Sequence, residues 1–250
     1  MSLDPAHVRV SLSPGEVKTG ALKIDNPSPD EVKIKVYLED WRYSSYSDGA
    51  KEFFPAGTTS LSCAKWVDFS PAEFTIPAFG RQVVNYTVRL PQAADGGHFA
   101  VMFFETNLTS DIGGNQGSAV QMKARLGALF SVEAQGKLNC QAGLGGIKVK
   151  KEEGLVRISA NFKNRGNTDI VPKITFHIID AQGKVFSRGK FSDIFTLPQD
   201  EGKISAETKE NLAAGDYILV ITMNLNKGLP EVLEVPIKVS ESQVNLASNG

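Results

Sequence analysis

The side chains that most often perform catalysis are few in this sequence and widely separated. The three histidines, His7, His98 and His177, lie on or beside predicted strands, far from one another along the chain. His177 falls within the apolar run ITFHII, where a packed histidine is the default interpretation. No acid or cysteine is arranged to make His98 a general base. We therefore predict no catalytic residues and a protein that is not an enzyme.

The spacing of cysteines and glycines gives no sign of a metal or a cofactor. Cys63 and Cys140 form no CxxC pair and no zinc-ligand spacing. The glycines at Gly113-Gly114 and Gly143–Gly146 precede no helical pattern and no Gly-Lys-Ser/Thr, so a phosphate-binding loop is unsupported. We expect neither cofactor nor metal. The two cysteines either remain free or pair in an oxidising compartment, where a loop this long contributes about 4 kcal/mol in the chain-entropy model.

Composition excludes two classes of partner. The chain has 250 residues, 22% of them charged, and a net charge of -1, which argues against a nucleic-acid-binding surface. No apolar run approaches the roughly 20 residues of a membrane span, so we expect no membrane insertion. Met1–Asp4 leads directly into strand-like sequence. The protein is therefore either cytosolic or a mature form whose signal peptide has been removed, and we favour the second, a periplasmic or exported protein.

The elements that position these residues are strands. Val32–Leu38 and Gln82–Leu90 alternate apolar and polar residues with period two, whereas His98–Glu105 is almost continuously apolar, as in a strand covered on both faces. Turn clusters separate about seven such runs in each half of the chain. We predict an all-β protein of two consecutive Ig-like antiparallel β-sandwiches, with domains at 5–135 and 142–240 and a polar tail at 241–250.

A long segment, Asp40–Val67, interrupts the alternation of the first half. A connection of this length inside a sandwich is uncommon and is often functional. Its aromatic residues either fold back to cap the end of the sandwich or form an exposed patch for a partner or a sugar. The candidate residues for that patch are Trp41, Tyr43, Tyr46, Phe53 and Trp66.

Several motifs of the first half resemble the first domain of periplasmic pilus chaperones, the PapD-like family. They are Leu12-Ser-Pro-Gly15, the run Gly20–Asn26, the proline-bearing run Phe69–Ile76, and the turn Pro77–Gly80 before a V-x-V strand. Related PapD-like domains occur in bacterial surface proteins that bind other cell-wall proteins. The second half resembles Ig or fibronectin-III-like modules of exported bacterial proteins.

This resemblance implies a binding mode for the last strand of the first domain, which we predict at Ser118–Val132. In the family that strand offers alternating apolar residues to a subunit lacking its own final strand. The corresponding residues here are Val120, Met122, Ala124, Leu126 and Ala128. The family also anchors the subunit's terminal carboxylate with two basic residues, one on the first strand and one on the last. The matching positions are Arg9 and either Lys123 or Arg125.

Two functions follow as hypotheses. The first is a non-enzymatic exported module that binds a secreted or surface protein, such as a pilus subunit or a cell-envelope protein, by strand addition along this last strand. The alternative is a structural or adhesive cell-surface module whose aromatic segment contacts carbohydrate or protein.

Overall fold

The structure, a computed structural model, describes residues 1–109, 121–152, 154–209, 212–225, 229–240 and 244–246. Within these ranges the regular structure is β-strand apart from one short 3-10 helix, η1 (Ala64–Trp66), which confirms the predicted all-β class. The chain divides into two compact units. Unit 1 comprises Met1–Arg42 and Glu52–Leu138, and unit 2 comprises Tyr43–Lys51 and Asn139–Gly250. None of the helical structure in the described ranges is long and apolar enough to cross a membrane.

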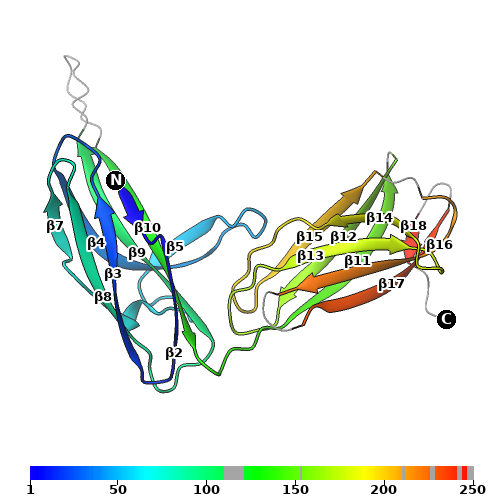
Figure 1. Cartoon of the computed structure of the whole chain (residues 1–250), viewed down its shortest axis with the longest axis horizontal. Coiled ribbons are helices and arrows are strands. Elements are labelled where there is room, and N and C mark those ends of the chain that lie inside the picture. Colours follow the sequence, from blue (N-terminus) through cyan, green and yellow to red (C-terminus); the bar gives the residue numbers. More distant parts are fainter. Residues whose placement is uncertain (110–120, 153, 210–211, 226–228, 241–243, 247–250) are drawn as a thin grey trace, which may run out of the picture. The chain divides into compact units, whose positions relative to one another are not determined.

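Unit 1 is a sandwich of two sheets (Figure 1). The smaller sheet has the order β1-β3-β8-β6. The larger has the order β2-β10-β9-β4-β5, with β7 also paired to β4. After β1 the chain passes to the larger sheet, where β2 runs parallel to β10. The strands of the smaller sheet are β1 (Ser2–Asp4), β3 (Val17–Asp25), β8 (Arg81–Arg89) and β6 (Val67–Ser70). Those of the larger are β2 (His7–Leu12), β10 (Gln121–Ala134), β9 (Gly97–Thr109), β4 (Val32–Tyr43), β5 (Lys51–Pro55) and β7 (Glu73–Ile76).

The core of unit 1 follows from the period-two alternation of its strands. Val8, Val10 and Leu12 of β2 are buried, whereas the residues between them are exposed. β9 is covered on both faces, as its continuous apolar sequence predicts, because every residue from Phe99 to Phe104 is buried. Each buried phenylalanine contributes about 2 to 3 kcal/mol of hydrophobic stabilisation. With three of them, β9 contributes strongly to the stability of unit 1.

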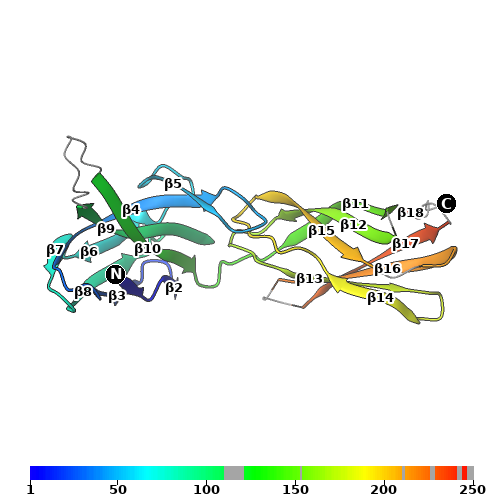
Figure 2. The ribbon, with the colours of Figure 1, turned by 90° about the horizontal axis from the view of Figure 1, so that it is seen from above.

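Unit 2 is a second sandwich, shown from another side in Figure 2. Its sheets have the orders β11-β12-β15 and β14-β13-β16-β17-β18. The strands are β11 (Ala142–Glu152), β12 (Leu155–Asn164), β13 (Lys173–Ile179), β14 (Val185–Lys190), β15 (Glu201–Thr208), β16 (Gly215–Asn224), β17 (Glu231–Val239) and β18 (Val244–Leu246). Pro236 of β17 lies beyond the three residues that pair with β18, so within the described part of the chain it pairs only with Ile218 of β16, as suits a strand proline.

Three features of the fold differ from the sequence-based expectations. The apolar run Ile194–Leu197 also predicts a strand, but this segment makes only an isolated bridge between Ile170 and Thr196. The expected polar tail contains β18. The segment Tyr43–Lys51 belongs to unit 2, where the Tyr46 side chain packs on the core and its carbonyl accepts a hydrogen bond from the Phe195 N–H at 2.9 Å. The domain ranges 5–135 and 142–240 therefore stay a prediction. They did not include the assignment of Tyr43–Lys51 to unit 2.

Candidate functional site

The candidate site is the unpaired edge of β10. This strand pairs with β9 from Gln121 to Glu133, almost its whole length. On its other side, β2 pairs only with Leu129–Ala134. Among the described residues no strand pairs with that side between Gln121 and Ala128. An edge of this kind carries unpaired backbone N–H and C=O groups and is a template for another strand.

The alternation of backbone groups identifies which residues face the open edge. In an antiparallel ladder the N–H and C=O of one residue point to the same side, and those of the next residue point to the other side. The N–H of Leu129 donates to the Ala6 carbonyl at 3.0 Å, so odd-numbered residues face away from β9. The open donors and acceptors of the edge therefore belong to Gln121, Lys123, Arg125 and Gly127.

Side chains on the inner face of β10 change from buried to accessible along the strand. Ala128, Phe130 and Val132 are completely buried in the core of unit 1, whereas Ala124 and Leu126 are half-buried. Ala128 is thus a core residue, which corrects its assignment to the partner-binding set. Val120 lies outside the described residues, and of Met122 only the backbone pairing is described. The inner face available to a partner is carried by Ala124 and Leu126.

The outer face of the same edge is an aromatic and cationic platform that we did not predict from the sequence. The Arg125 guanidinium lies over the Phe103 ring at 4.1 Å and over Phe53 at 5.1 Å. The Phe53 and Phe103 rings meet edge to face at 4.9 Å. A Cβ at Gly127 would lie 2.8 Å from Val101 and 3.0 Å from Phe103. Glycine at 127 therefore allows Phe103 to lie flat beside the edge.

Lys123 lies at one end of this platform, where it forms a hydrogen-bonded group with Glu105 and Tyr37. Its ammonium donates to Glu105 at 2.9 Å, and the Tyr37 hydroxyl donates to the other oxygen of Glu105 at 2.8 Å. The hydrogen bond from Lys123 is the main cause that lowers the pKa of Glu105. Burial raises the pKa of Tyr37. Glu105 is consequently ionised and Tyr37 protonated at neutral pH, so the group is fixed in one protonation state.

The expected carboxylate anchor of Arg9 with Lys123 or Arg125 is not formed. Arg9 lies opposite Ser131 in the β2–β10 register, about 20 Å along the strand from Arg125. Its guanidinium bonds Glu133 at 2.5 Å, and the Glu133 side chain is 7% exposed. The charge of Arg9 therefore compensates a buried carboxylate within unit 1. The pairing of Arg9 with Glu133 depends on the register between β2 and β10, which cannot be predicted from the sequence alone.

The aromatic residues of the Asp40–Val67 segment do not form one exposed patch. Trp41 is 4% exposed, donates its indole N–H to the Ala100 carbonyl at 3.2 Å and packs on Phe99, so of the two alternatives the buried one applies to Trp41, and it is not part of an exposed patch. The other four are half-buried and lie in different places. Phe53 is part of the platform, Trp66 packs on His98, and Tyr43 and Tyr46 belong to unit 2. The segment mainly covers apolar surface.

The polar groups that most often do chemistry are separated here. The His7 ring bonds the Ser131 hydroxyl at 2.9 Å, and the His98 ring bonds the Asp95 carbonyl at 3.0 Å. Burial is the main cause that lowers the pKa of His98. In the described ranges no three side chains of His, Cys, Asp or Glu are grouped to bind a metal ion.

Cys63 and Cys140 are not joined to each other by a disulfide, and they differ in accessibility, which gives a labelling prediction. Cys63 is completely buried, and burial together with the Asp40 charge raises the pKa of its thiol. Cys140 is half-buried in unit 2. We expect a thiol reagent such as DTNB to label one cysteine per folded chain, Cys140, and two in denaturant. Two fast-reacting thiols in the folded protein, or none in denaturant, would contradict the structure.

The chain folds as two sandwiches. In unit 1 the first strand is divided between both sheets, and the last strand is half covered by its parallel neighbour. These features define a PapD-like fold. The class 5 fimbriae chaperone CfaA is similar to this chain, with a TM-score of 0.53 and 13% identity over 96% of this chain and 99% of that one. A chain from the chaperone–tip adhesin complex of CFA/I fimbriae gives 0.50 and 11%, covering 93% and 97%. At these identities the likeness shows the fold. No protein-family model and no curated protein matches the sequence.

Proposed function

We propose that this protein is a chaperone-like binding module that accepts a strand of a secreted or surface protein on the open edge of β10. The observation that carries the proposal is the stretch Gln121–Ala128, which pairs with β9 on one side and with no described strand on the other. Strand addition takes its affinity from main-chain hydrogen bonds and its specificity from alternate side chains. Ala124 and Leu126 supply those side chains on the inner face, and Arg125 and the half-buried Phe53, which pack on the buried Phe103 ring, supply a second contact surface.

The proposal includes a non-enzymatic role in the cell envelope. Its support is the fold shared with a fimbriae chaperone, together with the separation of the histidines and cysteines described above. A pilus subunit or another envelope protein with an incomplete sheet is the kind of client that an open edge of this length fits. The small side chain of Ala124 next to Leu126 favours a client groove with one deep pocket.

A matched pair of variants at Lys123 tests whether the backbone of this edge binds the client. Lys123→Pro removes an N–H that faces the open edge, whereas Lys123→Ala removes only the side chain. The full chain is immobilised on a resin and incubated with envelope extract of its host. Wild type and Lys123→Ala should both retain the same client protein, in about equal amount to the immobilised chain. Lys123→Pro should weaken its binding by about tenfold, the loss expected for one backbone hydrogen bond. Tryptophan fluorescence and thermal unfolding check that each variant is folded.

Amide exchange supplies a readout that does not depend on substitution. In the free protein the N–H groups of Lys123, Arg125 and Gly127 should exchange much faster than those of Ala124 and Leu126, which pair with β9. Adding the client should slow the three odd-numbered amides. Unchanged exchange in the complex, or full retention by a folded Lys123→Pro variant, would place the interface elsewhere.

A further inference from the structure

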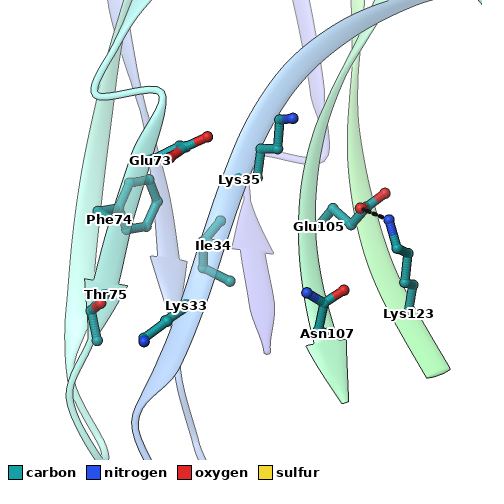
Figure 3. A pocket seen from close by; sticks show the side chains of 9 residues that line it. All are labelled: Lys33, Ile34, Lys35, Glu73, Phe74, Thr75, Glu105, Asn107 and Lys123. Carbon is teal, nitrogen blue, oxygen red and sulfur yellow. Dashed lines mark hydrogen bonds and ion pairs between the residues drawn. The ribbon is translucent and has the colours of Figure 1, made fainter. Parts of the chain in front are cut away.

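The larger sheet of unit 1 is split between β4 and β9. These strands pair only between Lys35–Glu39 and Val101–Glu105. Towards its start, β4 pairs with β7 on its other side, from Val32 to Lys35. β9 continues to Thr109 and is paired there with β10 alone. Figure 3 shows the two strands moving apart, with Lys33 and Thr75 on one side of the gap and Asn107 on the other.

A groove of about 520 Å³ occupies this split. Side chains of β4, β7, β9 and β10 line it, and most of them are polar. The stretch of β9 beyond the β4 pairing has a length of about 13 Å at the usual rise per residue. That length matches about four residues of an extended peptide.

Both strands present backbone groups to this groove. The N–H of Val36 donates to the Ala72 carbonyl on the β7 side, so the neighbouring odd-numbered positions of β4, including Lys33, face β9. On β9 the even-numbered residues face β10, because odd-numbered residues of β10 face away from β9. Asn107 therefore faces the groove. Among the described residues no strand pairs with Lys33 or Asn107 on these sides.

The charges of the groove favour an acidic occupant at one end. Lys123 is bound to Glu105, and Glu73 lies opposite Lys35 in the β4–β7 register. Within the described part of the chain Lys33 forms no ion pair, and its β7 neighbour is the neutral Thr75. Among the described residues Lys35 forms no ion pair either, so three lysines of the groove, Lys33, Lys35 and Lys123, stand against two glutamates, and Lys33 has no carboxylate opposite it.

We propose that this groove binds an extended acidic peptide segment, inserted between β4 and β9. The peptide backbone pairs with Lys33 on one side and Asn107 on the other, and a carboxylate of the peptide meets the Lys33 ammonium. The backbone groups of this site belong to β4 and β9, on the side of β9 opposite β10, so the site does not depend on the edge of the proposed function, although the Lys123 side chain lines the groove as well.

The test uses fluorescein-labelled pentapeptides and fluorescence anisotropy with the full chain. Thr-Val-Glu-Val-Thr is the acidic probe, Thr-Val-Lys-Val-Thr its charge-reversed partner, and a backbone N-methylated acidic peptide removes the strand donors. We expect the acidic probe to bind, and both other peptides to bind at least tenfold more weakly. Lys33→Glu should reverse the preference between the two charged peptides, whereas Lys18→Glu, an exposed lysine of β3, should leave it unchanged.

Each other outcome overturns the proposal. Equal binding of the N-methylated peptide would show that the backbone is not recognised, and competition by free glutamate at the same concentration would show a site for small carboxylates. Equal loss in Lys33→Glu and Lys18→Glu would indicate general charge attraction. Absence of binding by the acidic probe to the folded protein would leave the groove without this ligand.

Discussion

Replacing Asp40 with alanine is expected to lower the free energy of unfolding of unit 1 by about 3 kcal/mol. Asp40 is completely buried and accepts hydrogen bonds from the Gly57 N–H at 3.2 Å, the Thr59 N–H at 2.8 Å and the Ser62 hydroxyl at 2.5 Å. Alanine leaves these three donors without their acceptor. The residues that follow also bond β9, since Phe99 donates to the Leu61 carbonyl at 2.7 Å.

Tryptophan fluorescence during urea unfolding measures this effect selectively, because the two tryptophans of the chain, Trp41 and Trp66, both belong to unit 1. Asp40→Asn keeps one acceptor oxygen and should give an intermediate loss. Asp68→Ala is the matched control, since Asp68 forms an exposed ion pair with Arg89 and such pairs contribute little. Equal losses for Asp40→Ala and Asp68→Ala would contradict the role of Asp40 as an anchor of this segment.

The sequence could predict the faces of the strands because period-two alternation is a local property. It places Val8, Val10 and Leu12 inside, and the unbroken apolar run at His98–Glu105 correctly indicates a strand covered twice. The same alternation identifies the inner face of β10. These conclusions need no knowledge of which strand lies beside which.

The sequence could not predict the features that depend on which strands lie side by side and in which register. Only the register of β2 shows that the covered half of β10 begins at Leu129, directly after Ala128, and that Arg9 reaches Glu133. The return of Tyr43–Lys51 to unit 2 likewise rests on long-range packing. One signal was present for the platform, since Gly127 interrupts an apolar strand, and a glycine there indicates the close approach of another group.

Along the inner face of β10, we expect Phe130 to determine the stability of unit 1 and Leu126 to determine client binding. Phe130 is completely buried and meets the Tyr86 ring edge to face at 5.1 Å. Phe130→Ala should lower the free energy of unfolding by about 4 kcal/mol through the cavity that it creates. Leu126 is half-buried beside the open edge, so Leu126→Ala should cost only about 1 kcal/mol.

The order reverses for client binding, because only Leu126 lies on the part of the strand that β2 leaves open. Leu126→Ala should weaken the complex by about tenfold or more, as expected for an apolar anchor in a partner's pocket. Phe130→Ala should bind normally at temperatures where unit 1 stays folded. Urea unfolding followed by tryptophan fluorescence and titration of the captured client measure the two quantities on the same variants. If both quantities fell together in both variants, β10 would act as a core strand over its whole length, and the open edge would not be the binding site.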